Sequence, residues 1–362
     1  MRRKSFLTLA GVTALAVAAA IVTQPSNHLT KIAGSGKVVA PDLVKSINDV
    51  RGITIARKKD TLTITRGKDG WRIKERGGYL VDPDKVKQLL VGLAGMKTLE
   101  PKTDRKDLYE RLELRDLSHK DTAAKLITVT GANNKTLAKL LIGKIARGRF
   151  GPGTIYYRKP GEKRAWKASG DLAFDHDPAN WIDKNVTDIR KTRVRLFAVT
   201  AKDGETVAAA RPKPGAALAL TTDPLPEGMV PKKDGTIAAL ANVLEKLTLE
   251  DVREANKIDW ATKTVSTAEI RTYDGIVITA RVAEVKKDEF WVSLEFTYDG
   301  DGAIVPKGKA HEKMEIKTAA AAKKEIAELM ARVKGWAYKL PATNLSHLRL
   351  RLKDVLDKKK TS

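Results

Sequence analysis

The chain has 362 residues, a formal net charge of +24, a hydrophobic fraction of 42% and no cysteine. This hydrophobic content is sufficient for packed cores and excludes a disordered chain, and a chain of this length accommodates roughly two or three domains. The absence of cysteine excludes a disulfide framework, a thiolate zinc site and a cysteine nucleophile.

Residues 1–23 have the parts of a secretory signal or a single-span anchor: a basic start, an apolar run and small residues near its end. The apolar run, residues 6–22, is at the short limit for a helix that crosses a bilayer. The basic start stays in the cytoplasm under the positive-inside rule. We therefore predict a bacterial inner-membrane protein with its body in the periplasm. Cleavage after Ala18 or Ala20, which would free the body in the periplasm, is the alternative.

The large positive charge would ordinarily suggest a nucleic-acid partner. Export across the membrane argues against one, and the basic residues occur as scattered pairs such as Lys58-Lys59 and Lys286-Lys287 rather than in one arm. We therefore expect no nucleic-acid partner and interpret the charge as solvated protein faces. Attraction to anionic lipid or to an anionic envelope polymer is the alternative.

Residues 24–48 are interpreted as a linker that leads into a short amphipathic segment. A first α+β repeat, residues 49–175, follows it. Apolar residues alternate with polar ones along its first part, as in half-buried strands, and Asp69-Gly70 has the chemistry of a hairpin turn. A helix is predicted to begin at Asp82-Pro83, which suit the N-cap and the first helical position. Further strands are expected at 125–130, 136–142, 154–158 and 164–168.

A similar order of elements recurs in residues 193–300, after a connector at residues 176–192. Here Asp234 is expected to cap a helix that runs to Leu247. Both predicted helices exit into a Leu-Glu pair, which favours an internal duplication. Strands are expected at 265–272, 276–285 and 290–296. Because hairpins dominate, we predict an α+β fold built from duplicated antiparallel strand-hairpin and helix units.

Residues 301–362 are predicted to form a C-terminal helical segment, with a helix from about Thr318 to Ala337. The spacing of leucines between Leu345 and Leu356 is compatible with a strand or with a helix, and both remain open at this point.

No arrangement of residues points to catalysis, so we expect no catalytic residues, no metal site, no cofactor and no enzymatic activity. Asp175-His176-Asp177 is the densest group of metal-binding side chains, but the proline that follows favours a turn and a helix cap. Ser346 and His347 are adjacent, and neighbours on a strand point to opposite faces.

A candidate binding site consists of Trp181, Asp183 and Lys184, in the polar segment that joins the two repeats. Aromatic residues are scarce in this chain, so a tryptophan in a polar segment is notable. The favoured interpretation of Trp181 is a packing anchor between domains, and a ligand platform is the alternative.

Several short motifs together resemble those of the bacterial domain of unknown function (DUF) 4340 family. They are Asp69-Gly70-Trp71, Asp82-Pro83, Leu108–Leu114, Leu140–Gly143, Tyr156-Tyr157, Asn180–Lys184 and Gly335–Pro341. Members of this family are commonly membrane-anchored and often occur beside ABC-transporter components. The resemblance therefore implies an extracytoplasmic accessory subunit rather than a known reaction. The basic, alanine-rich character of this chain departs from the family pattern and puts a shared partner in doubt.

Two functional hypotheses follow. The first is a non-enzymatic, membrane-anchored scaffold or accessory subunit of an ABC-type transporter. The second is a soluble periplasmic module that binds or hydrolyses an anionic envelope polymer.

Overall fold

A computed structural model describes residues 35–148, 151–172, 174–213, 215–304 and 314–359. The chain forms two compact units, Met1–Asp183 and Lys184–Ser362, and the boundary between them lies within the predicted connector. The predicted signal or anchor, residues 1–23, lies outside the described residues. Within the described ranges, no helix has the length and apolar character needed to cross a membrane.

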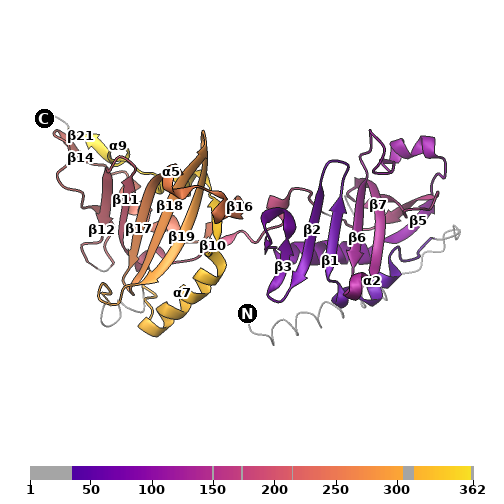
Figure 1. Cartoon of the computed structure of the whole chain (residues 1–362), viewed down its shortest axis with the longest axis horizontal. Helices are drawn as coiled ribbons and strands as arrows, with labels where there is room; N and C mark the ends of the chain where they lie inside the picture. The colour runs from indigo at the N-terminus through magenta and orange to yellow at the C-terminus, as the bar shows by residue number, and fades with distance from the viewer. Residues whose placement is uncertain (1–34, 149–150, 173, 214, 305–313, 360–362) are drawn as a thin grey trace. The chain divides into compact units, whose positions relative to one another are not determined.

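The first unit is built on a nine-stranded antiparallel sheet with the order β4-β3-β2-β1-β6-β7-β8-β9-β5 (Figure 1). Its strands are β1 (Gly52–Ala56), β2 (Thr61–Gly67), β3 (Gly70–Ile73), β4 (Tyr79–Leu80), β5 (Lys97–Pro101), β6 (Lys125–Thr130), β7 (Thr136–Ala146), β8 (Thr154–Arg158) and β9 (Ala165–Ser169). Its helices are α2 (Pro41–Lys45) and α3 (Pro83–Gly95), with single-turn or short 3-10 helices η1 (Ile47–Asp49), η2 (Lys74–Arg76), η3 (Lys106–Leu112), η4 (Ala132–Asn134) and η5 (Pro178–Asn180).

The predicted first helix and its cap are confirmed in α3. The Asp82 carboxylate accepts a 2.9 Å hydrogen bond from the Asp84 backbone N–H, and Pro83 occupies the first turn. Helical spacing then places Val86, Leu89 and Leu93 on one buried stripe. In Figure 1, a helix lies behind the first sheet and none crosses in front of β1 and β2.

The two faces of the first sheet differ because side chains alternate along each strand. One face carries Ile53, whose cross-strand partners are Ile64 on β2 and Val129 on β6, and all three are buried. The other face carries Thr54, which lies between Thr63 and Thr128 in a partly exposed row. A separate cluster on this second face, made by the segment between β5 and β6 with β7 and β9, contains Tyr109, Leu114, Ala124, Leu141 and Ala165.

The edge of the first sheet at β5 is covered by the chain that precedes α2. The Gly36 backbone N–H donates to the Thr98 carbonyl at 2.7 Å, and the Thr98 N–H donates to the Lys37 carbonyl at 2.9 Å. Gly36 has a φ of +79°, which favours glycine at this position. The exposed hydrogen-bonding groups of this edge are therefore partly satisfied by the chain itself.

The second unit contains an eight-stranded antiparallel sheet with the order β13-β12-β11-β17-β18-β19-β20-β16 and two small two-stranded sheets, β10-β15 and β14-β21. Its strands are β10 (Asn185–Thr187), β11 (Val194–Ala201), β12 (Thr206–Ala210), β13 (Ala219–Leu220), β14 (Met229–Pro231), β15 (Leu247–Thr248), β16 (Asp251–Glu254), β17 (Thr264–Thr272), β18 (Ile276–Lys286), β19 (Glu289–Tyr298), β20 (Trp336–Lys339) and β21 (Leu356–Lys358). Its helices are α4 (Thr236–Ala239), α5 (Trp260–Lys263), α7 (Ala319–Val333), α8 (Ala342–His347) and α9 (Leu352–Val355), with 3-10 helices η6 (Lys191–Arg193), η7 (Leu240–Leu244) and η8 (Ala255–Lys257).

The two large sheets share one strand order. In each large sheet the strand that comes first along the chain, β1 or β11, lies inside the sheet and pairs with the second strand of its hairpin. After a helical segment, the next strand of the large sheet, β5 or β16, lies at the far edge of the sheet. The four strands that come later in the chain, β6 to β9 or β17 to β20, lie between this edge strand and the first strand. Both segments that lead from this edge strand back to the centre form hydrophobic clusters, which contain Tyr109 in the first unit and Ile258 in the second. The fold is therefore α+β with antiparallel strands, as predicted.

Three predicted elements differ from the structure. The second helix is divided between α4 and η7 and ends at Leu244, before Lys246 adopts a φ of +49°. The third helix begins at its predicted cap, Thr318, but α7 ends at Val333 because Gly335 reverses the chain with a φ of +86°. Residues 336–339 then join the large sheet as β20. The C-terminal segment contains both helices, α8 and α9, and a strand, β21.

Candidate functional site

Trp181, the first residue of the predicted binding site, is a packed residue of the first unit. Its side chain is 3% exposed, and its indole N–H donates to the Asp175 carbonyl at 2.7 Å. The preceding turn is closed by two carboxylates: Asp175 accepts from the Asp177 N–H at 2.8 Å, and Asp177 accepts from the Ala179 N–H at 2.9 Å. The turn and helix cap predicted for Asp175-His176-Asp177 are thus confirmed, and the Trp181 ring offers almost no surface to a ligand.

The backbone on either side of Trp181 adds a short pairing to the edge of β4. The Asp82 N–H donates to the Trp181 carbonyl at 2.8 Å, and the Asp183 N–H donates to the Leu80 carbonyl at 3.0 Å. Lys184, the third predicted site residue, belongs to the second unit, where its carbonyl accepts a 3.0 Å hydrogen bond from the Leu249 N–H. The backbone hydrogen bonds of Trp181 and Asp183 are therefore made within the first unit, and that of Lys184 is made within the second unit.

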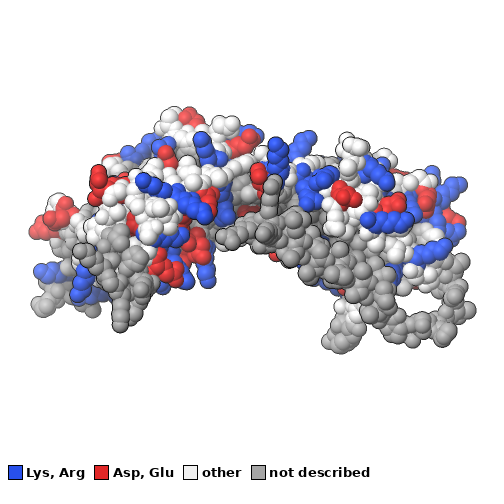
Figure 2. All heavy atoms as spheres, turned by 90° about the horizontal axis from the view of Figure 1, so that it is seen from below, with Lys and Arg blue, Asp and Glu red and all other residues white. Residues whose placement is uncertain are grey.

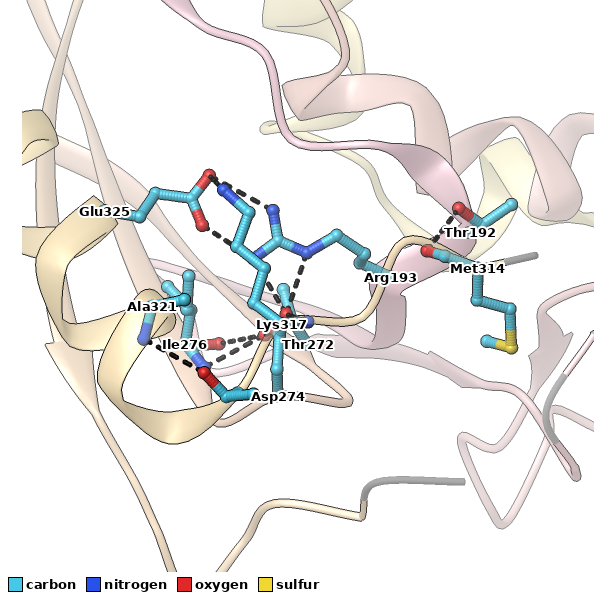
Figure 3. Close-up of polar contacts among 10 residues, drawn as sticks. Thr192, Arg193, Thr272, Asp274, Ile276, Met314, Lys317, Ala321 and Glu325 are labelled. Carbon is cyan, nitrogen blue, oxygen red and sulfur yellow. Dashed lines mark hydrogen bonds and ion pairs between the residues drawn. The ribbon is translucent and has the colours of Figure 1, made fainter. Parts of the chain in front are cut away.

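The most deeply buried charges lie in the second unit, around Arg193 at the end of η6 (Figure 3). The Arg193 side chain is 2% exposed, and its Nε donates to Asp274 at 2.9 Å. Its two terminal nitrogens donate to the Glu325 carboxylate on α7 at 3.1 and 2.7 Å. One arginine thus joins the start of β11, the β17–β18 turn and α7.

The two carboxylates of this network have further donors. Asp274 accepts from the Thr272 hydroxyl at 2.6 Å and from the Lys317 backbone N–H at 2.9 Å. The Lys317 ammonium lies 3.0 Å from Glu325. Burial alone would raise the pKa of Glu325, but the hydrogen bonds and charges of Arg193 and Lys317 outweigh it and hold that pKa below its usual value. The positive charges of Arg193 and Lys317 equal in number the negative charges of Asp274 and Glu325, which indicates a network that stabilises the fold.

A pocket of about 400 Å³ opens elsewhere in the second unit. It is lined by Thr236, Ser346, His347, Arg349, Leu350 and Asp354, which come from α4, α8, the turn after α8 and α9. Ser346 and His347 line the same pocket because they lie on a helix, α8, and not on a strand. The Ser346 hydroxyl donates to the Thr343 carbonyl at 2.7 Å, so its proton is not directed at the imidazole.

Two polar groups of this pocket, one on His347 and one on Arg349, lack a hydrogen-bond or ion-pair partner among the described residues. Nδ1 of His347 is buried and has no hydrogen-bond partner among the described residues, and burial lowers the pKa of this imidazole. The Arg349 guanidinium lies over the Phe290 ring, 3.5 Å from its centroid, and no described carboxylate is within ion-pair distance of it. Asp354 provides the acidic side of the pocket and accepts a 2.9 Å hydrogen bond from the Arg351 N–H.

The surface charge is mixed. Figure 2 shows Lys and Arg side chains interspersed with Asp and Glu over the described part of the face in view. Many basic residues have acidic partners, such as Arg351 with Asp203 and Glu205 in the second unit. Among the described residues, no group of three or more His, Asp or Glu side chains is placed to hold a metal ion.

The family model described as "Domain of unknown function (DUF4340)" matches residues 71–269, which is more than half of the chain. The chain belongs to the DUF4340 family. This confirms the resemblance seen in the motifs. The DUF4340 match runs from β3 to β17 and crosses the boundary after Asp183, so it takes in parts of both units. A comparison with curated proteins found no match.

The sequence did not point to the Arg193 network or to the pocket. Arg193 lies within the DUF4340 match, whereas Asp274, Glu325 and the pocket residues after Thr236 lie C-terminal to it. The one signal for the pocket in the sequence is the pair Ser346-His347, which would point to opposite faces only if this segment were a strand and which lies on the helix α8.

Proposed function

We propose that this DUF4340 protein is a non-enzymatic scaffold or accessory subunit of an ABC-type transporter, held at the bacterial inner membrane by residues 6–22, with its body in the periplasm. The observation that carries the proposal is the repeated sheet. The two units have one strand order, and in each sheet a partly exposed face lies opposite a face that is packed with apolar side chains. We take the repeat to be an internal duplication.

In the first unit, the partly exposed face is lined by threonines. Thr54 lies between Thr63 and Thr128, and Thr65 and Thr130 lie on either side of Gly52 in the adjacent row. Short β-branched side chains give a flat surface on which another protein can pack closely without ordering long side chains. This surface suits a protein partner better than a small ligand, which needs a concave site.

In the second unit, the corresponding face has alanine in the same central place. Ala198 on β11 lies between Ala208 on β12 and Glu269 on β17, and all three are partly exposed. The buried face behind it holds Phe197, whose partners Ala209 and Ile270 are also buried. A partly exposed outer face on a well-packed sheet is what a rigid docking module requires.

The proposal is tested by affinity capture of the full-length protein from detergent-solubilised membranes, followed by mass spectrometry of the captured proteins. We expect subunits of an ABC-type transporter in the wild-type capture. A Thr54→Lys,Thr128→Lys variant, which places two long charged side chains on the flat face, should lose them.

The matched control is Val91→Lys, which adds a lysine at a position of α3 that is 37% exposed, away from the threonine row. It should retain the partners. Capture without any transporter subunit, or equal recovery with the Thr54→Lys,Thr128→Lys variant, would reject the scaffold role. Recovery of the protein in the soluble periplasmic fraction with residues 1–20 removed would favour the free periplasmic module.

A further inference from the structure

We propose that the pocket at α8 binds a saccharide unit that carries a carboxylate or a phosphate group. All of its lining residues belong to the second unit, so this inference does not depend on the proposed scaffold role. The pocket volume of about 400 Å³ falls within the range of small-molecule sites, which hold a few convergent polar groups.

Arg349 is the group that would take the anion. Its guanidinium stacks on Phe290 at 3.5 Å, so one of its planar faces is occupied by the ring while its N–H groups point outward in the guanidinium plane. With no described carboxylate at ion-pair distance, this planar fork is available for bidentate hydrogen bonds to an oxyanion. Stacking also restricts the side chain before a ligand arrives, which lowers the entropy lost on binding.

The remaining polar groups suit hydroxyls. Ser346 uses its proton on the Thr343 carbonyl, so its oxygen can only accept from a ligand. The Asp354 carboxylate accepts from the Arg351 N–H through one oxygen and has lone pairs left for a hydroxyl donor. His347 also lines the pocket, and its buried Nδ1 has no hydrogen-bond partner among the described residues.

This mixture of groups argues against a simple inorganic anion. Asp354 lines the pocket, and Asp234 accepts a 2.9 Å hydrogen bond from the backbone N–H of Thr236, another lining residue. The Asp354 carboxylate in the lining would repel a small multivalent anion. A saccharide separates its charged group from its hydroxyls by several bonds, so it can place the anion on Arg349 and its hydroxyls on Asp354. Leu350 adds an apolar wall for ring C–H groups.

Isothermal titration calorimetry on the purified full-length protein tests the proposal, with glucuronate, glucose 6-phosphate, glucose and inorganic phosphate as probes. We expect saturable binding of glucuronate or glucose 6-phosphate, and the stronger of the two identifies the oxyanion. Glucose should bind at least tenfold more weakly than that ligand. Saturable binding of neither charged sugar, or binding of inorganic phosphate as tight as that of the better sugar, would overturn the proposal.

Arg349→Gln should weaken binding of the charged sugar by roughly 10- to 100-fold, the usual cost of losing hydrogen bonds to a charged group, and leave the weak binding of glucose unchanged. Lys353→Gln is the control, because it removes a positive charge from exposed α9 at a residue that does not line the pocket. An equal loss in both variants would show a general charge effect and overturn the site.

Asp354→Asn distinguishes a saccharide from a bare anion. The asparagine side chain still accepts from the Arg351 N–H, so α9 should keep its cap. Asp354→Asn should weaken binding of the charged sugar several-fold, because it removes a strong acceptor of hydrogen bonds from the sugar hydroxyls. Tighter binding of the charged sugar in this variant would contradict the assigned hydroxyl contact. Far-ultraviolet circular dichroism confirms that each variant is folded.

Discussion

Replacement of Arg193 by methionine is the sharpest test of what holds the second unit together. Methionine approximates the length of the arginine stem but removes every hydrogen bond to Asp274 and Glu325. Removal of one partner from a buried ion pair typically costs about 3–5 kcal/mol, because the remaining charge stays buried without compensation. The structure places this variant near the lower figure for two reasons. Asp274 keeps two donors, and Glu325 keeps the Lys317 ammonium and is 15% exposed.

A loss of about 3 kcal/mol is a large part of the 5–15 kcal/mol that stabilises a typical domain. With a urea dependence of about 2 kcal/mol per molar, the unfolding midpoint of the second unit should fall by about 1.5 M. Tryptophan fluorescence reports on both units, since Trp166 and Trp260 lie in different ones. Hydrogen exchange across a urea series, read peptide by peptide, separates them. Peptides from 184–359 should lose protection early, while those from 35–183 remain unchanged.

The matched control is Arg190→Met, three residues earlier on the same segment. Arg190 also pairs with two carboxylates, on Glu245 and Glu315, but its side chain is 52% exposed. Exposed pairs of this kind contribute little, so the midpoint should hardly move. If Arg193→Met lowered the midpoint no more than Arg190→Met does, the network would not stabilise the fold and the argument from burial would be wrong.

Three further changes give distinct outcomes. Asp82→Ala removes the α3 cap and should lower the free energy of unfolding of the first unit by about 1 kcal/mol in urea titrations, whereas Asp82→Asn should retain it. Leu89→Ala empties a fully buried position on the same helix and should cost about 2–5 kcal/mol in the same assay, and a smaller loss would mean that α3 does not pack on the sheet. His347 has a pKa lowered by burial, so the folded state binds fewer protons than the unfolded one. The neutral imidazole of His347 therefore contributes to the stability of the second unit above the unfolded pKa of about 6.5, and this contribution is lost as pH falls below that value. His347→Gln should flatten that part of the curve of unfolding free energy against pH.

Acid should also weaken the Arg193 network, through Glu325. The folded-state pKa of this carboxyl is lowered, so its contribution is present above its unfolded value of 4.5 and is lost as pH falls through the lower folded value. Thermal unfolding of the second unit between pH 5 and pH 3, at intervals of about half a unit, should show a steeper loss for the wild type than for Glu325→Gln. Parallel curves of unfolding temperature against pH for the wild type and Glu325→Gln would contradict the conclusion that the charge of Glu325 stabilises the second unit.

Strands with strict alternation were the part of the fold that could be predicted from sequence. Lys125–Thr130 and Thr154–Arg158 match β6 and β8 residue for residue, because buried and partly exposed positions alternate over most of each strand. The helix predicted to run to Ala337 wrongly takes in Trp336 and Ala337, the first two residues of β20, because Ala337 continues the apolar stripe of α7 and only the reversal at Gly335 separates them. The spacing of apolar residues alone does not distinguish a helix from a strand in a segment of so few residues.

The buried network and the pocket could not be predicted, for a different reason. Arg193 and Glu325 are 132 residues apart, and each stands among other charged residues that are solvated. Only the strand order brings η6, the β17–β18 turn and α7 together. The pocket likewise depends on α4 meeting α8 across more than a hundred residues.

The pairing of Gly36 and Lys37 with Thr98 fixes where the chain first joins the sheet of the first unit, and under the proposed anchoring this limits how far that unit can lie from the bilayer. If residues 6–22 span the membrane, the 13 residues 23–35 separate the end of that span from Gly36, where the chain pairs with the sheet. Fully extended, they reach at most about 50 Å. The first unit would then be confined to a thin layer of periplasm beside the membrane. Its partners would have to be sought on the periplasmic surfaces of membrane proteins, within that reach.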